Sequence, residues 1–455
     1  MKNALIIVHN FPPYGDVGGS IRTVKFVKYL PNFLWKPIIL SVKRGQPYKD
    51  DKFFNQINGK AELFYTKDYI PFFLLQIMNK VKKFINPKSE KINAQIKKNN
   101  SSRHYFQNLF LMTAKLFKHI LSVPIFIPDI AILWLIKAYK QAVIIVKSRK
   151  IDVIFSTSPP HSTHLIGLIL RAKYNIPWVV EFRDQWADNP ASYSKSNCKL
   201  EKLLNKILER IVVKKAKVVI SATQSGTKSL SNKYKNTKSN FITITNGFDP
   251  EDFEYNVGKY PDDLKQNKMI FTHVGVISAG RDPSFFLRSI YEIICENPTI
   301  SKNLEVRFVG DFKCDIEFWQ NELPGILVCT GQIDHSSAIK EMFKADVLLI
   351  FQPSCVGSEF AIPGKLYEYI ATGNPILAMT SQGPSKDFID THRLGITVDY
   401  TDIKGIKEAI LKLYSDWNQK TLHKYKNDEL INKYNRKNLT ENLVDVFNKL
   451  TLTKT

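Results

Sequence analysis

The chain has 455 residues, of which 44% are hydrophobic and 24% charged, a balance typical of folded globular proteins and not of disordered ones. This length exceeds one ordinary hydrophobic core, so we expect two domains. Five cysteines, at positions 198, 295, 314, 329 and 355, have neither CxxC spacing nor regular pairing, which predicts a reduced compartment without disulfides or bound zinc.

The first predicted element is a buried strand, "ALIIVH" (4–9). Its apolar run is too short for a signal peptide, and no apolar run in the chain reaches the eighteen or so residues that cross a bilayer. We therefore expect a cytoplasmic protein. Further strands are predicted at 36–42, 151–158, 176–182, 216–223 and 240–247, with helical patterns between them.

Lysines are scattered along the chain, but the formal net charge of +23 is not distributed uniformly. Residues 71–150 contain fifteen Lys and Arg against only Glu90 and Asp129. Apolar residues at helical spacing alternate with lysines over 69–85 and 105–127, a pattern that suits an anionic membrane surface. Ordinary helices packed on the core are the alternative. No signature of RNA or DNA binding occurs, so we expect no nucleic-acid partner.

The second half repeats the alternation of short apolar strands and helices. Strands are predicted at 268–275, 304–311, 325–333, 345–352, 374–381 and 394–400. Residues 247–268 are polar and rich in Gly, Pro and Asp, and they read as a linker. The pattern predicts an α/β fold of two doubly wound parallel sheets that face each other across a cleft, with a last amphipathic helix at 433–450.

Loops that follow strands are where ligands bind in such sheets. After the first strand, Gly18 and Gly19 precede a helix expected near Ser20, and backbone without Cβ atoms could approach a phosphate or sugar closely there. In the second half, Arg281 precedes a helix expected near Pro283, where a guanidinium suits a diphosphate. The alternatives are a simple glycine turn and a surface pair of Arg281 with an acid such as Asp282.

The stretch "IPGKLYEYIATGNPILAM" (362–379) predicts a short helix followed by a buried strand. Pro363 stands at the helix start, and Gly373 with Pro375 ends it. Lys365 and Glu368 are three apart and share a face near the helix N-terminus, where anions are favoured. A first-turn surface pair is the alternative reading.

Two first-half blocks also follow strands, at 157–167 and 179–190. They carry His161, His164, Glu181, Arg183, Asp184 and Trp186. A lone histidine is more often structural than catalytic, whereas Asp184 at the end of an apolar strand is the stronger candidate. No metal-binding spacing and no Ser–His–Asp order is visible, so no metal is expected.

In their order and spacing, these pieces resemble the large retaining glycosyltransferase family 4 of the GT-B fold. The segments on which the resemblance rests are "FPPYGDVGGSIRTVKFVKYL", "STSPPHSTHLIGLILRAKYNIPWVVEFRDQW", "TNGFDP", "GRDP" and "IPGKLYEYIATGNPILA". The resemblance covers nearly the whole chain except about 60–125. It implies an N-terminal acceptor domain (1–250) with a basic helical insert at about 65–147. A nucleotide-sugar domain (251–430) and a C-terminal helix (431–455) that packs back on the first domain would follow.

The resemblance also implies roles by position. Gly18 and Gly19 would pass near the donor diphosphate, while Arg281 and Lys365 would neutralise the departing diphosphate. Glu368 would bind the ribose hydroxyls, and Gly364 and Leu366 would belong to the donor-binding helix. Asp184 would be the acceptor-side catalytic candidate.

The implied activity is transfer of a hexose-type sugar, with retained configuration and without a metal or other cofactor, to a glycan or lipid-linked acceptor in surface polysaccharide synthesis. The expected location is the inner face of the cell membrane, in peripheral contact with anionic lipid. Three positions depart from the family pattern: Phe360 stands where the first motif glutamate is usual, Leu287 replaces a lysine, and Arg183 precedes Asp184 where many relatives have a histidine. A GT-B sugar-nucleotide 2-epimerase and a catalytically degenerate binding protein are therefore the alternatives.

Overall fold

A computed structural model of the chain describes residues 1–14, 17–45, 52–67, 126–188, 199–254, 268–313, 316–354 and 358–452. These residues form two compact units. The first comprises residues 1–220, 231–242 and 446–455, and the second comprises 221–230 and 243–445. The predicted basic helices over 69–85 and 105–127 lie outside the described residues, except for 126 and 127.

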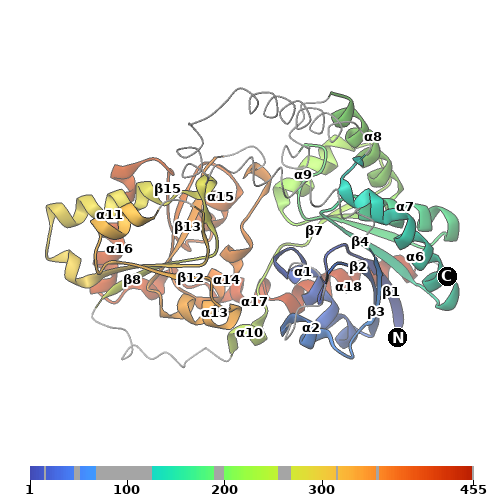
Figure 1. Cartoon of the computed structure of the whole chain (residues 1–455), viewed down its shortest axis with the longest axis horizontal. Helices are drawn as coiled ribbons and strands as arrows, with labels where there is room; N and C mark the ends of the chain where they lie inside the picture. Colours follow the sequence, from blue (N-terminus) through green and yellow to red (C-terminus); the bar gives the residue numbers. More distant parts are fainter. Residues whose placement is uncertain are drawn as a thin grey trace, which may run out of the picture. The chain divides into compact units, whose positions relative to one another are not determined.

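The first unit is built on a seven-stranded sheet with the order β3-β2-β1-β4-β5-β6-β7 (Figure 1). Its strands are β1 (Lys2–Ile7), β2 (Trp35–Lys43), β3 (Glu62–Lys67), β4 (Val153–Ser158), β5 (Trp178–Phe182), β6 (Val218–Ser221) and β7 (Asn240–Thr243). Its helices are α1 (Val17–Tyr29), α2 (Lys52–Ile57), α6 (Leu135–Ser148), α7 (Ser162–Tyr174) and α8 (Lys199–Lys215). Helix α9 (Gln224–Lys233) is divided between the units, with residues 224–230 in the second. The pairs β1–β2, β2–β3, β1–β4 and β4–β5 are parallel, as helical crossovers between strands require.

The second unit has a six-stranded sheet with the order β12-β10-β8-β13-β14-β15. The strands are β8 (Met269–Val274), β10 (Leu304–Val309), β12 (Leu327–Gly331), β13 (Val347–Gln352), β14 (Ile376–Thr380) and β15 (Gly395–Val398). A two-stranded ribbon, β9 (Ile277–Ser278) with β11 (Phe312–Lys313), accompanies it. The helices are α10 (Pro250–Glu254), α11 (Ser284–Glu296), α12 (Glu317–Glu322), α13 (His335–Lys344), α14 (Gly364–Thr372), α15 (Pro384–Thr391), α16 (Ile403–Asn418), α17 (Asp428–Lys433) and α18 (Arg436–Leu452).

The second sheet is covered on both faces, which explains why its strands are continuous apolar runs. Alternate residues of β13 enter two different clusters: Val347, Leu349 and Phe351 pack with α11 and α16, whereas Leu348 and Ile350 pack with α13, α14 and α15. Successive side chains of a strand point to opposite faces, so burial on both faces needs apolar residues at every position. The predicted doubly wound α/β architecture is confirmed in both units.

The last helix contributes to both units. Residues from Val446 onward belong to the first unit, where Phe447 lies edge-on to Trp35 and Phe155, with ring centroids 5.2 and 6.0 Å away. The Trp35 indole also donates to Asn448 Oδ1 at 3.1 Å. This is the packing on the first domain that the sequence predicts for the C-terminal helix.

Candidate active site

The strongest candidate site lies between β8 and β13, where the order in which strands are added to the second sheet reverses. Strands added after β8 lie on one side of it up to β12, and β13 to β15 lie on the other. In open α/β sheets ligands bind outside the carboxyl ends of the strands at such a switch point. The two strands pair only at Phe271 with Val347 and at Thr272 with Leu348. Beyond these pairs, side chains take over the hydrogen bonding.

His273 and Tyr369 supply those side-chain bonds. The buried His273 places Nδ1 2.9 Å from the Leu349 carbonyl oxygen, and the Tyr369 hydroxyl accepts from the Val274 N–H at 3.0 Å. A carbonyl oxygen only accepts hydrogen bonds, so Nδ1 carries the proton and Nε2 of His273 presents a lone pair. Burial, with the nearby Lys365 adding to it, holds the His273 pKa well below its usual value, so the ring is neutral.

Lys365 uses that lone pair. It is the second residue of α14, and its Nζ lies 3.0 Å from His273 Nε2, to which it donates. Burial, followed by the positive charge of Arg281, lowers the Lys365 pKa to about 7, while Glu368 opposes the shift. The ammonium is thus held in a fixed place at the N-terminus of a helix, a position that favours an anion.

Gly275, just after β8, makes room for Lys365. Its φ of +125° lies in the region that glycine tolerates, and an added Cβ would stand 2.7 Å from Lys365 Nζ. The Gly275 N–H donates to the Val309 carbonyl at 2.7 Å. The main chain therefore approaches the lysine closely because position 275 carries no side chain.

Arg281 stands beside this pair with its guanidinium available. It ends a short 3₁₀ turn (Ala279–Arg281), it is exposed, and it forms no hydrogen bond or ion pair with any residue that the structure describes. The alternative of a surface pair with Asp282 is not observed, because Asp282 Oδ1 instead accepts from the N–H and hydroxyl of Ser284 at the start of α11. Arg281 and Lys365 are close enough for the charge of Arg281 to depress the Lys365 pKa.

Glu368 lies one turn beyond Lys365 on α14 and is half-buried. Burial raises its pKa, which His335 and Arg436 oppose and Asp252 supports. The Gly364 position is exposed with open space around it, whereas the Leu366 side chain is fully buried in the core and its N–H bonds to the Pro363 carbonyl at 3.0 Å. Among the predicted donor-binding residues of α14, the side chains of Lys365 and Glu368 are the ones that can meet a ligand.

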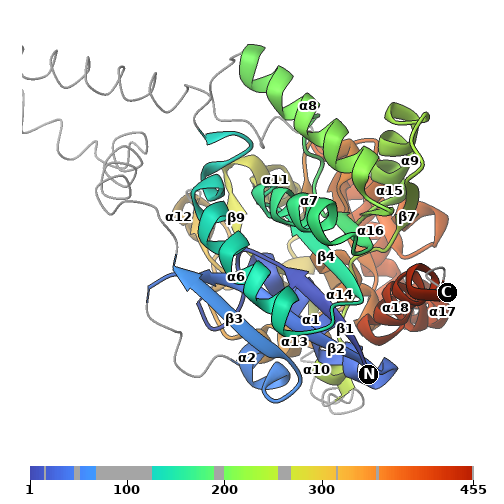
Figure 2. The same ribbon diagram turned by 90° about the vertical axis from the view of Figure 1, so that its right-hand side faces the viewer.

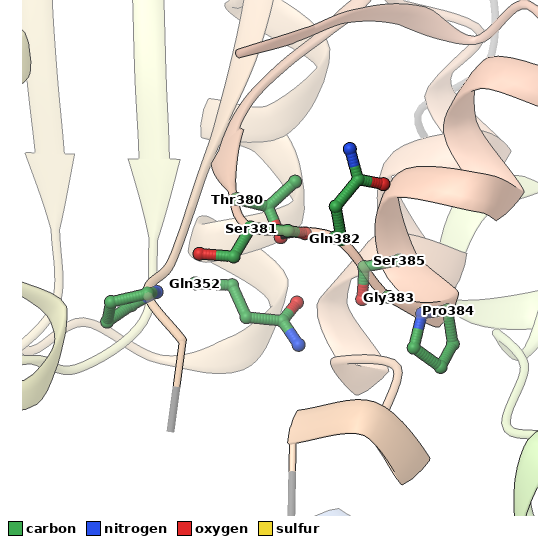
Figure 3. A pocket seen from close by; sticks show the side chains of 8 residues that line it. Gln352, Thr380, Ser381, Gln382, Gly383, Pro384 and Ser385 are labelled. Carbon is green, nitrogen blue, oxygen red and sulfur yellow. Dashed lines mark hydrogen bonds between the residues drawn. The ribbon is translucent and has the colours of Figure 1, made fainter. Parts of the chain in front are cut away.

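The position of the missing motif glutamate is also defined. Phe360 ends a 3₁₀ turn (Ser358–Phe360), and its carbonyl accepts from the Thr223 hydroxyl at 2.7 Å. Glu359, one residue earlier, is exposed. A pocket next to this loop is lined by Gln352, Pro353 and residues 380–385, at the carboxyl ends of β13 and β14 (Figure 3). The Gln352 amide donates to the Ala361 carbonyl at 3.3 Å, which ties the pocket wall to the segment that enters α14.

The remaining predicted residues belong to the first unit. Gly18 and Gly19 form the first turn of α1, which begins at Val17 and therefore earlier than the expected start near Ser20. A buried ion pair fixes this helix: Arg22 Nε and Nη2 each lie 2.8 Å from Glu181 Oε1, and Thr157 donates to Glu181 Oε2 at 2.6 Å. The glycine turn is thereby tied to β4 and β5.

Asp184 follows β5 two residues after its end. Desolvation raises the pKa of its carboxyl, and the neighbouring Arg183 opposes that shift. His161 is stacked on Trp186 with ring centroids 4.7 Å apart and 2° between the planes. Burial lowers the His161 pKa to about 3, so the ring is neutral and serves packing, in agreement with the structural reading of the lone histidines.

The structure thus brings Arg281, Lys365 and Glu368 together in the second unit and places Gly18, Gly19 and Asp184 in the first. Two residues of the site, His273 and Gly275, were not singled out from the sequence. The signal for the first is a polar residue inside the apolar strand "MIFTHV". In the part of the chain that the structure describes, no group of three or more His, Cys, Asp and Glu side chains could hold a metal ion.

Comparisons with known proteins agree with this fold. Residues 109–252 match the sequence profile of Glycosyltransferase Family 4. No curated protein sequence matches the chain.

Solved structures share the fold over nearly the whole chain. One is Anabaena HepE in complex with UDP-glucose, at 11% identity and a TM-score of 0.58, covering 99% of this chain and 100% of that one. Another is an α,α-trehalose-phosphate synthase (UDP-forming) from Burkholderia vietnamiensis, at 9% identity and a TM-score of 0.58, covering 99% of this chain and 100% of that one. A putative UDP-N-acetylglucosamine 2-epimerase from Listeria monocytogenes is similar at 9% identity and a TM-score of 0.56, covering 98% of this chain and 95% of that one. At these identities the likeness concerns the fold alone.

Each unit has a doubly wound α/β fold, and the chain shares the GT-B fold with these structures. The profile match adds that residues 109–252 are similar to Glycosyltransferase Family 4.

Proposed function

We propose that the chain is a retaining glycosyltransferase that moves a hexose-type sugar from a nucleotide diphosphate to a glycan or lipid-linked glycan acceptor in surface polysaccharide synthesis. The observation that carries the proposal is the Lys365 ammonium, held by His273 at the N-terminus of α14 and beside Arg281. Two cations and a helix N-terminus in one place suit a diphosphate.

In the proposed reaction, Arg281 and Lys365 stabilise the negative charge that develops on the diphosphate as the sugar–oxygen bond breaks. Fixed donors of this kind are among the largest contributions to catalysis, because they need no reorganisation during the reaction. Glu368 accepts hydrogen bonds from the ribose hydroxyls of the donor. Asp184 is the acceptor-side candidate. We propose that the reaction needs no metal, since the cationic side chains take that role.

Calorimetric titration of the full chain with UDP-sugars and GDP-sugars tests the proposal. We expect binding of at least one nucleotide sugar, loss of binding in Lys365→Ala, and unchanged binding in Lys404→Ala, a control lysine that is exposed on α16. Absence of binding to every nucleotide sugar would refute the enzyme reading. When a transferred product is found, the NMR coupling at its anomeric centre reports whether configuration is retained.

A sugar-nucleotide 2-epimerase is the second candidate, because a protein described as a putative UDP-N-acetylglucosamine 2-epimerase shares the fold over 98% of this chain. The two activities differ in what they need. An epimerase would isomerise or release its nucleotide sugar without any acceptor, whereas a transferase would turn over only when an acceptor is supplied. Binding of a nucleotide sugar without either turnover would point to the degenerate protein suggested by Phe360.

A further inference from the structure

Helix α8 (Lys199–Lys215) presents an unusual outward face. Its exposed apolar residues are Leu200, Leu203, Ile207 and Ile211, which are 49%, 54%, 44% and 40% exposed. They recur every three or four residues, so they form one stripe along the helix. Figure 1 and Figure 2 show α8 at the outer edge of the first unit.

The other exposed positions of α8 are all basic. They are Lys199, Lys202, Lys206, Arg210, Lys214 and Lys215. The helix also contains two glutamates, but Glu201 and Glu209 are buried, at 8% and 1% exposure, and point to the protein interior. Within α8, which the structure describes in full, no acidic side chain is therefore exposed.

This distribution is not a general consequence of the basic composition, because a surface helix of the second unit differs from it. The exposed residues of α16, a surface helix of the second unit, include Glu408 among lysines and polar residues, and Leu411 is its one exposed large apolar side chain. The inner face of α8 is fixed by its glutamates: Glu209 accepts from the Tyr234 hydroxyl at 2.6 Å and from the Ala187 N–H at 2.6 Å. The helix is held firmly while its outer face stays in solvent.

We propose that the outer face of α8 docks on the surface of an anionic lipid bilayer. An apolar stripe beside a basic stripe is the arrangement by which helices lie in the plane of a membrane interface, with apolar side chains inserted and lysines directed to the headgroups. The absence of exposed acids on α8 removes the repulsion that an anionic surface would otherwise meet. No helix among the described residues is long and apolar enough to cross a membrane, so this contact would be peripheral.

The neighbouring helices extend the basic character of this side. Helices α6 and α7 contain no Asp or Glu, and α7 contacts both α6 and α8. Ile136 and Ile144 on α6 are 65% and 58% exposed. The docking surface is defined by α8, and Ile136 and Ile144 lie on α6, which α7 separates from α8.

Sedimentation of the full chain with vesicles tests the proposal. One set of vesicles contains phosphatidylcholine alone, and the other contains phosphatidylglycerol as well. We expect binding to the anionic vesicles, weak binding to the neutral ones, and partial release at 1 M salt, where the Debye length falls from about 10 Å at 0.1 M to about 3 Å.

Two sets of variants separate charge from insertion. The triple variant K206E/R210E/K214E should reduce partitioning onto anionic vesicles by about 100-fold or more, since each basic residue near such a surface contributes about fivefold. The variant L203Q/I207Q should reduce it by about 10-fold through lost apolar burial. The control K404E/K412E/K437E changes the net charge of the second unit equally and should leave partitioning unchanged; all three of its lysines are exposed.

Circular dichroism and thermal unfolding establish that each variant is folded, which exposed positions should allow. Wild-type partitioning by both α8 variants would overturn the proposal, as would loss in the charge variant with none in L203Q/I207Q, because that result would indicate diffuse electrostatics. Failure of the wild type to bind anionic vesicles would also overturn it and would favour an acidic protein partner. The nucleotide-sugar titration is a separate measurement, so the two proposals can fail independently.

Discussion

His273 Nε2 accepts a hydrogen bond from Lys365 Nζ over 3.0 Å, and the Leu349 carbonyl determines which ring nitrogen is available for it. The histidine is buried in β8, whereas the lysine stands on α14. The His273 side chain, in the sheet, thereby fixes the position of the Lys365 ammonium on the adjoining helix. This contact lies at the point where the β8–β13 ladder stops.

We predict that His273→Leu weakens nucleotide-sugar binding by about 1.5–3 kcal/mol, the usual size of a hydrogen bond to a charged group. The substitution removes the acceptor that fixes Lys365 and keeps the strand apolar. Thr272→Val is the matched control in the same strand, because the Thr272 hydroxyl is buried without a partner among the described residues. Calorimetry measures the nucleotide-sugar affinity of both variants, and thermal unfolding measures their stability. Equal weakening in the two would show that the strand, and not the contact with Lys365, matters.

The pH dependence of donor binding follows from the Lys365 pKa of about 7. A diphosphate favours the charged lysine and should raise this pKa, so binding takes up a proton above pH 7. The affinity should then fall as the pH rises from about 7 toward the pKa of the complex, by at most tenfold per pH unit. Titrations in buffers of different ionisation enthalpy measure the proton uptake. Lys365→Met should abolish it; an affinity that is flat from pH 6.5 to about 8.5 would contradict the assignment.

Gly275→Ala should displace Lys365. The added methyl group would stand 2.7 Å from Nζ, and the φ of +125° is unfavourable for alanine. We expect a loss of donor affinity together with about 1–3 kcal/mol of stability, as is typical for strain at a special backbone conformation. Gly280→Ala is the control in the same loop, since nothing lies within 4 Å of its added Cβ. Denaturant unfolding and calorimetry separate the two effects.

Arg281→Ala should cost about 2–4 kcal/mol of transition-state stabilisation, the range found when one fixed donor to developing charge is removed. The quantity to measure is kcat/KM for the donor, once an acceptor is known. Arg288→Ala offers a matched comparison, because among the described residues this exposed arginine pairs with Glu292 one turn away and such pairs contribute little. Wild-type turnover by a folded Arg281→Ala protein would place the diphosphate elsewhere.

Glu181→Gln should lower the free energy of unfolding by about 3–5 kcal/mol, because it leaves the Arg22 guanidinium buried without its carboxylate. The pair is almost fully buried, at 3% and 0% exposure. Replacing both partners by apolar residues should recover much of the loss. Glu292→Gln, which breaks an exposed pair, serves as the reference and should change stability little. A small effect of Glu181→Gln would mean that the pair does not hold α1 against β4 and β5.

The sequence alone predicts most of the sheet structure. The twelve predicted strands are all present, because both faces of each sheet are covered and buried strands therefore appear as continuous apolar runs. The strand that was missed, β3 (Glu62–Lys67), is half-buried along most of its length and lacks such a run. The two-residue strands β9 and β11 are too short to have any period.

The candidate site was predictable only in part. The placement of Lys365 and Glu368 on one helical face follows from their spacing. The exposed guanidinium of Arg281 is compatible with the diphosphate contact predicted for its loop. The contact of Lys365 with His273 was not predictable, because it depends on where the pairing of two strands distant in sequence stops. The need for glycine at position 275 likewise depends on a lysine ninety residues later in the chain.

The division of α18 between the two units has a consequence for the order of folding during synthesis. Trp35 and Phe155 are buried against Phe447, so part of the first unit's core is supplied by residues made after the entire second unit. The nascent first unit must wait on the ribosome with that apolar surface uncovered until residues 446–452 emerge. Its final consolidation is thus a late event, and chaperones that shield exposed aromatic surface would act on it throughout translation.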